Sequence, residues 1–157
     1  MRMLSDGDDI VIVTAGIGTE EAMRAAAPLA TAGVGVRHLH VSTHKPLADP
    51  LLLASIERSR YGVVTLENHT IIGGLGSAVA EMMAEAGLGK KLLRLGLKDT
   101  YAHGASRPYL MKEYGLDAGA LVRGVEQLIG RSTGITDEDL SETRIEATHS
   151  LAKAEAL

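Results

Sequence analysis

Four short apolar runs recur in the first hundred residues, and turns and segments of helical spacing separate them. Residues 9–15 (DIVIVTA) and 63–66 (VVTL) are rich in β-branched residues, which is typical of strands buried on both faces. Residues 34–41 (VGVRHLHV) alternate in polarity, and residues 91–97 (KLLRLGL) are again apolar. The pattern therefore predicts four strands with helices between them.

The intervening segments carry helix start and stop signals. Thr19 follows the first strand and is predicted to be the N-cap of a helix that ends near Gly33. Pro28 is expected to end or kink this helix early. Asp117 is predicted to cap a last helix over residues 118–129. This alternation of strands and helices predicts an α/β layered domain with a largely parallel sheet.

Changes in composition divide the chain into three parts. Residues 1–8 are polar and are predicted to be a lead-in without fixed structure, residues 9–130 the folded domain, and residues 131–157 a polar tail. The apolar residues of the tail are sparse, so we expect the tail to be separable from the fold. Residues 136–139 (TDED) begin like a capping box, which leaves a surface helix in the tail open.

The stretch 61–86 combines a strand, a polar turn, a glycine cluster and a helix N-terminus. In open α/β sheets, ligands and partners gather at the carboxyl edge of the strands. The glycines indicate either a loop that approaches another backbone or an anion, or a plain turn that needs positive φ and small residues. The candidate site from this stretch consists of Glu67, His69, Ile71, Ile72, Gly73, Gly74 and Gly76.

The side chains of this stretch leave alternatives open. Glu67 and His69 share a face of a strand, so they are a candidate acid–base pair. Alternatively, Glu67 accepts backbone N–H bonds from the glycine loop; we favour this interpretation because such bonds are strong and common at turns. Ile71 and Ile72 are adjacent aliphatic residues in a loop, which indicates burial under a neighbouring segment or contact with a partner.

Two other motifs are weaker. Gly16 and Gly18 begin like a dinucleotide fingerprint, but Glu21 stands where the third glycine would be and would repel a pyrophosphate, so we predict a plain turn. His38 and His40 lie on the same face of a strand and could chelate a metal. No third ligand is evident beyond His44, so we favour a half-exposed or edge strand that carries polar side chains.

Composition narrows the function classes. A chain of 157 residues with 45% hydrophobic and 23% charged residues predicts one domain with a real core. The aromatic share of 3%, the net charge of −4 and the lack of a dense Lys/Arg run argue against nucleic-acid binding. The absence of cysteine excludes disulfides and Cys-based zinc sites. No apolar stretch approaches the roughly 20 residues of a membrane span, and no signal peptide is evident, so we expect a cytoplasmic protein.

Three segments resemble, in order, the C-terminal domain of transketolases. They are residues 9–49, residues 66–81 (LENHTIIGGLGSAVAE) and residues 103–129, and the resemblance covers about residues 8–130. The same domain is the C-terminal domain of deoxyxylulose-phosphate synthases and of the β subunits of 2-oxo acid dehydrogenases. The segments GASRP (104–108) and KEYGLD (112–117) favour the transketolase side.

The resemblance implies a three-layer α/β/α domain with a five-stranded mixed sheet, mostly parallel with one antiparallel strand. We expect the fifth strand to be short and to lie near Arg60 or Tyr101. In the family, two other domains hold thiamine diphosphate and its metal, and their motifs are missing here. We therefore expect this chain alone to bind no cofactor, and thiamine diphosphate and Mg²⁺ to be held in the complete enzyme. Met1 and the tail favour a separately encoded component over a fragment.

The implied function is that of the C-terminal component of a transketolase, which moves a two-carbon ketol unit between sugar phosphates. We expect the isolated chain to be inactive and to contain no catalytic residue. Its expected partners are the subunits that carry the thiamine-diphosphate-binding domains, in a homo- or hetero-oligomer. Because the family places subunit contacts at this domain, we expect Ile71 and Ile72 to face a partner. The alternative is a stand-alone regulatory module on the same fold that binds a small molecule or a nucleotide.

Overall fold

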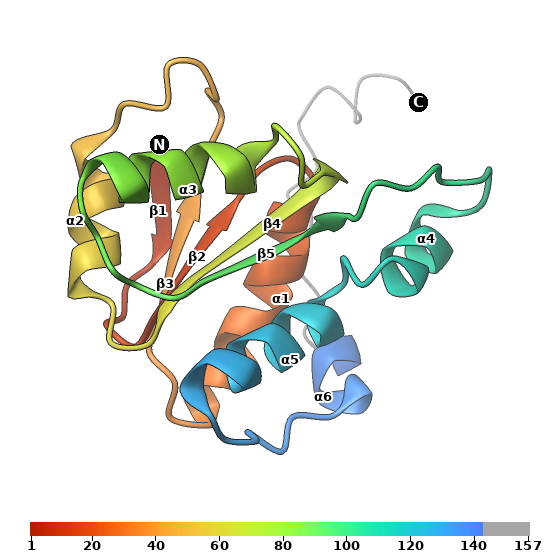
Figure 1. Cartoon of the computed structure of the whole chain (residues 1–157). Coiled ribbons are helices and arrows are strands. Elements are labelled where there is room, and N and C mark those ends of the chain that lie inside the picture. Colours follow the sequence, from red (N-terminus) through yellow and green to blue (C-terminus); the bar gives the residue numbers. More distant parts are fainter. Residues whose placement is uncertain (143–157) are drawn as a thin grey trace, which may run out of the picture.

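The chain forms one α/β domain in a computed structural model that describes residues 1–142 (Figure 1). Strands and helices alternate from the second strand to the fifth, as the hydrophobic pattern predicts. The elements are β1 (Arg2–Ser5), β2 (Ile10–Thr14), α1 (Gly18–Thr31), β3 (Val36–His40), α2 (Pro50–Arg58), β4 (Gly62–Thr70), α3 (Leu75–Glu85), β5 (Leu92–Leu97), α4 (Arg107–Glu113), α5 (Ala118–Ile129) and α6 (Asp137–Glu142).

The sheet has five strands in the order β1-β3-β2-β4-β5. Strands β3, β2, β4 and β5 pair in parallel, and β1 pairs with β3 in antiparallel fashion. The mixed, mostly parallel sheet implied by the family resemblance is therefore confirmed. The expected position of the fifth strand, near Arg60 or Tyr101, is wrong, because this strand is β1.

The first eight residues are not an unstructured lead-in, which corrects the prediction for them. β1 adds to the edge of the sheet, and the Ser5 hydroxyl donates to the Val36 carbonyl at 2.8 Å. The turn that follows is held by Arg37, whose buried guanidinium pairs with Asp6 and with Asp8. A buried arginine needs such partners. The sequence pattern missed β1 because RMLS contains no β-branched residue.

Helices cover both faces of the sheet (Figure 1). One face packs against α1 and α5 through a core of aliphatic residues that includes Ile12, Leu66 and Leu121. The other face packs against α2 and α3 through a second core that includes Val13, Leu52 and Val79. All five residues of β2 are buried, as expected for a central strand covered on both sides.

The expected N-cap of α1 is wrong, and the helix continues slightly past Pro28. The helix begins at Gly18 with Ile17 as its N-cap, so Thr19 lies inside the first turn and not at the cap. The Thr19 hydroxyl instead forms hydrogen bonds with Thr14 of β2 and His40 of β3. Pro28 lies within the helix, which continues to Thr31. The proline stands in the last turn, so the helix extends only three residues beyond it.

The part of the tail that the structure describes packs against the domain. Thr136 and Asp139 form the predicted capping box, in which the Thr136 N–H donates to the Asp139 carboxylate at 2.7 Å. The helix that follows, α6, buries Leu140 against the core beside α1 and α5. The expected boundary at residue 130 therefore does not separate residues 131–142 from the fold. The rest of the predicted tail, residues 143–157, lies outside the described residues.

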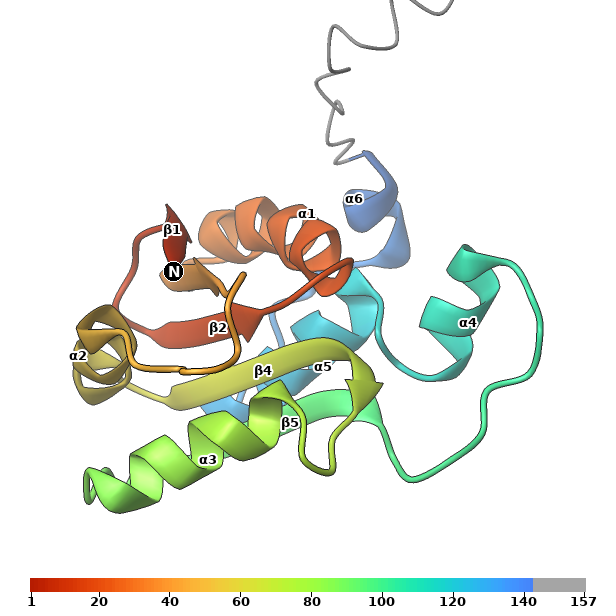
Figure 2. The same cartoon turned by 90° about the horizontal axis from the view of Figure 1, so that it is seen from above.

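One segment extends beyond the layered body. The loop after β5 and the helix α4 project past the carboxyl end of β5, as both views show (Figures 1 and 2). Tyr101, in this loop, is 100% exposed. α4 contacts the domain through Met111, which is buried in the core on the α1 and α5 face. Two exposed ion pairs also join α4 to the domain: Arg107 with Glu20 at 3.4 Å, and Lys112 with Asp137 at 3.7 Å.

Candidate functional site

The glycine loop is attached to the sheet by a buried carboxylate. β4 ends beside the start of α3, and Glu67 points from β4 toward that helix N-terminus. Its two carboxylate oxygens accept the backbone N–H groups of Leu75 at 2.6 Å and Gly76 at 2.9 Å. Glu67 is only 4% exposed. The interpretation of Glu67 as the acceptor that holds the loop closed is therefore supported by the geometry, and it satisfies N–H groups that a helix start leaves unpaired.

Two residues that the sequence reasoning missed attach the other side of the loop. The Ser77 hydroxyl donates to the Ile71 carbonyl at 2.8 Å and accepts the Gly73 N–H at 3.1 Å. Arg94, from β5, donates to the same carbonyl and to Ser77, each at 3.2 Å. No sequence motif indicates these roles, because Arg94 is far from the loop along the chain and lies beside it only through the pairing of β4 with β5.

Gly73 and Gly74 each occupy a position that disfavours a larger residue, for different reasons. Gly73 has φ +70°, a left-handed conformation that side chains disfavour. Gly74 lies so close to the Glu67 carboxylate and the Thr70 carbonyl that a Cβ would overlap both. The glycine cluster thus combines features of both alternatives left open by the sequence: the positive φ of a turn at Gly73, and a close approach to another backbone, that of Thr70, at Gly74.

The two isoleucines of the loop differ in environment. Ile71 is half-buried; its side chain lies against Gly96, and its N–H donates to the Leu97 carbonyl at 3.0 Å. Ile72 is 62% exposed on the tip of the loop. A loop fixed on both sides therefore presents one large aliphatic side chain to the surroundings.

His69 does not form the proposed acid–base pair in this arrangement. Its side chain is exposed, and its Nδ1 lies 3.1 Å from the Thr70 carbonyl oxygen. Both oxygens of Glu67 are occupied by the backbone of α3. The geometry favours a structural role for Glu67 and leaves His69 as a surface group beside the loop.

A pocket of about 500 Å³ lies next to the glycine loop at the carboxyl edge of the sheet. Its walls come from the ends of β2 and β4, the start of α3 and the loop after β3. The polar side chains on these walls are His44, Lys45, Asn68 and His69, together with Glu67. This volume lies within the range of small-molecule sites, about 300–1,000 Å³.

His38 and His40 belong to a chain of hydrogen bonds. The His38 Nε2 lies 2.8 Å from the Thr14 hydroxyl, Thr14 lies 3.0 Å from the Thr19 hydroxyl, and Thr19 lies 2.9 Å from the His40 Nδ1. Burial, with a smaller contribution from the neighbouring His40, lowers the pKa of His38 to about 4. The predicted half-exposed or edge strand is wrong: β3 lies between β1 and β2, and His38 is 1% exposed.

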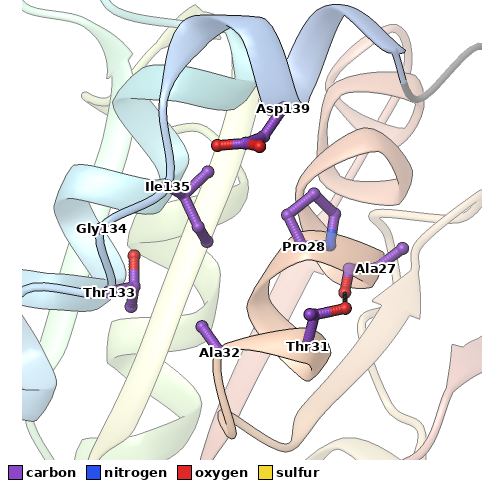
Figure 3. A pocket seen from close by; sticks show the side chains of 8 residues that line it. All are labelled: Ala27, Pro28, Thr31, Ala32, Thr133, Gly134, Ile135 and Asp139. Atoms are coloured by element: carbon purple, nitrogen blue, oxygen red, sulfur yellow. Dashed lines mark hydrogen bonds between the residues drawn. The ribbon is translucent and has the colours of Figure 1, made fainter.

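A second hollow, of about 550 Å³, lies away from the sheet edge (Figure 3). Residues 27–32 of α1 form one wall, and residues 133–139 form the other. Figure 3 shows Ile135 and Asp139 facing Pro28 across it. Among the described residues that line this hollow, the charged side chain is Asp139, which accepts hydrogen bonds from the Thr136 N–H and hydroxyl.

Within residues 1–142, no three or more His, Asp or Glu side chains are grouped so that they could hold a metal ion. None of the helices described is both long and apolar enough to cross a membrane.

Comparison with known proteins identifies the family. The model of the transketolase C-terminal domain matches residues 1–121. A protein of Methanocaldococcus jannaschii whose name describes a transketolase C-terminal section is 39% identical over 124 residues, which cover 79% of this chain and 38% of that protein. The 6-deoxy-6-sulfo-D-fructose transketolase subunit of Clostridium sp. is 37% identical, over 82% of this chain and 39% of that subunit.

Solved structures agree with this assignment. A split-gene transketolase, described as an inactive β4 tetramer, superposes with a TM-score of 0.74 and 34% identity over 82% of this chain and 41% of that chain. Transketolase from Leishmania mexicana, at 18% identity, shares the fold with a TM-score of 0.62 over 82% of this chain and 18% of that chain. The chain thus spans less than half the length of each of these relatives.

Proposed function

The chain belongs to the transketolase C-terminal domain family, and from this membership we propose that it is the C-terminal component of a thiamine-diphosphate-dependent transketolase. The complete enzyme would transfer a two-carbon ketol unit between sugar phosphates. The relatives are more than twice as long as the matched region, so the remaining parts of the enzyme would be supplied by other domains or subunits. Thiamine diphosphate and Mg²⁺ would be held there.

The role proposed for this component is assembly. The supporting observation is the loop that carries Ile72. Glu67, Ser77 and Arg94 fix its backbone by hydrogen bonds, while the Ile72 side chain remains 62% exposed. A rigid loop loses little conformational entropy on binding, so an apolar side chain on it is suited to a protein contact. Ile71 is half-buried within the domain and is not part of this proposed contact.

Reconstitution tests this proposal. Ketol transfer is measured with the chain alone, with the thiamine-diphosphate-binding subunits of the same cell alone, and with increasing amounts of the chain added to those subunits. We expect no activity from the chain alone and a saturable rise in the mixture. A mixture that behaves like the thiamine-binding subunits alone at every concentration would contradict the component role.

Variants of Ile72 test the proposed contact separately. Ile72→Asp places a charge where an apolar surface is expected, so we predict that at least about tenfold more chain is needed for half-maximal activity. Ile72→Val, the matched control, should behave nearly as the unmodified chain. Equal behaviour of both variants would exclude the loop as a contact but would leave the component role intact.

A stand-alone regulatory module on the same fold is the second candidate. The pocket beside the glycine loop favours it, because a small-molecule site needs a hollow of this size. Saturable binding of a metabolite by the isolated chain, without any gain in ketol transfer on reconstitution, would favour this candidate.

A further inference from the structure

The pocket beside the glycine loop lies between the carboxyl ends of the neighbouring strands β2 and β4. From β2 the chain passes over one face, through α1, to β3; from β4 it passes over the other face, through α3, to β5. β2 and β4 are neighbours, so the connections diverge between their carboxyl ends. Such a switch point opens a crevice in parallel sheets, and ligands of this fold class bind there.

Residues from both strands line this crevice. Ala15 and Gly16 follow β2, and residues 67–69 end β4. Gly16 has φ +58°, and the Asn68 carboxamide oxygen lies 2.7 Å from the position that a Cβ would take. The absence of a side chain at Gly16 makes room for the Asn68 carboxamide, which lies on the wall of the pocket.

The charge on the walls is unevenly distributed. Lys45 is an exposed cation on the loop after β3, and His44 and His69 are also exposed on the lining. The carboxylate among the described lining residues, Glu67, is buried, and its two oxygens accept the N–H groups of Leu75 and Gly76. Its charge is compensated by the start of α3, so the groups available to a ligand are cationic or neutral donors.

The same hydrogen bonds limit how an anion could bind. Because Glu67 already occupies the N–H groups of Leu75 and Gly76, the helix start does not offer them to a ligand. Recognition of negative charge would fall to Lys45 and the histidines, and hydroxyl groups would be read by Asn68. Among the described residues that line the pocket, the aromatic rings are the imidazoles of His44 and His69.

We propose that this pocket, which we call the switch-point pocket, binds a small organic anion that carries a phosphate or a carboxylate group on a polar body. Lys45 pairs with the anionic group, and Asn68 contacts the body. This binding role does not depend on the assembly role of Ile72, which lies on the tip of the adjoining loop.

Calorimetry and two-dimensional NMR on the unmodified full chain test the proposal. The probes are inorganic phosphate, glucose 6-phosphate, citrate and, as a neutral control, glucose. We expect saturable binding of at least one organic anion below about 10 mM, weakened by added salt, and none of glucose. Preference for glucose 6-phosphate or for citrate distinguishes the phosphate from the carboxylate source. Absence of saturable binding, or equal binding of glucose, would overturn the proposal.

Three variants locate the site. Lys45→Ala removes the cation and should weaken anion binding at least about fivefold, because a charge-assisted contact is lost. Ala78→Leu adds bulk to the pocket wall and should abolish binding, with thermal melting as the check on its fold. Lys91→Ala removes an exposed lysine outside the pocket and should change nothing. If Lys45→Ala and Lys91→Ala bind the anion equally well, the site is not this pocket.

Discussion

At the scale of single residues, Glu67 is the group on which the glycine loop depends most. Glu67→Gln keeps the shape of the side chain. The amide nitrogen of the new side chain would face one of the two N–H groups that the carboxylate accepts in the unmodified chain. One buried N–H would then lack a partner, which costs about 1–3 kcal/mol. We predict a loss of this size in the free energy of unfolding, measured by urea denaturation. Glu81→Gln, at an exposed position of the same helix, is the matched control, and an equal effect of both changes would contradict the role of Glu67.

His38 gives the fold a pH dependence. Its pKa is about 4 in the folded protein, against about 6.5 for an unperturbed histidine, so the unfolded chain binds a proton between these values that the folded chain does not. The contribution of His38 to stability is complete above pH 6.5 and is lost as the pH falls toward 4, by on the order of 3 kcal/mol.

Urea denaturation at pH 7 and at pH 4.5 tests this dependence. We expect His38→Gln to lower stability at pH 7 but to show a smaller loss on acidification than the unmodified chain. His44→Gln, at an exposed position, should leave the pH dependence unchanged. If His38→Gln loses as much unfolding free energy between pH 7 and pH 4.5 as the unmodified chain, then other groups cause the acid sensitivity.

Residue roles could be predicted where they depend on neighbours along the chain. The Glu67 bonds to α3 and the cap at Asp117 join residues at most nine positions apart, and the sequence indicated both. The roles of Arg94 and Thr14 were missed because each reaches its partner only through the lateral order of the strands. The spacing of His38 and His40 indicated a shared face but not that the face is buried.

At the scale of elements, the helix α6 is the least expected part of the packing. Leu140 is 5% exposed, and its carbonyl accepts a bond from Arg24 of α1 at 3.1 Å. Glu126 accepts the Thr133 N–H at 2.6 Å and so anchors the connection to α5. These contacts tie residues 131–142 to the domain, although their sparse apolar pattern predicts a separable tail.

Truncation after Arg131 tests this packing. Burial of one leucine stabilises by about 1.5–3 kcal/mol, so we predict that Tm falls by several degrees. Leu140→Ala should reproduce much of the fall, whereas Glu138→Ala, at an exposed position of α6, should not. A truncated chain that melts like the full chain would restore the boundary at residue 130.

At the scale of the whole molecule, strand order explains why the candidate surfaces lie together. The divergence of connections between β2 and β4 places the switch-point pocket and the Ile72 loop at the same carboxyl edge. The alternation of hydrophobic runs was enough to predict the layers and the parallel sheet. It could not supply the lateral order of the strands or β1, because a short edge strand without β-branched residues leaves little trace in the pattern.

Sedimentation velocity measures most directly whether this domain is an assembly component. The chain is mixed with the thiamine-diphosphate-binding subunits of the same cell, and the two are labelled with different chromophores. We predict one faster boundary that carries both labels and shrinks when Ile72→Asp replaces the unmodified chain. Two boundaries that sediment independently at all concentrations, with the unmodified chain in full excess, would contradict the proposed component.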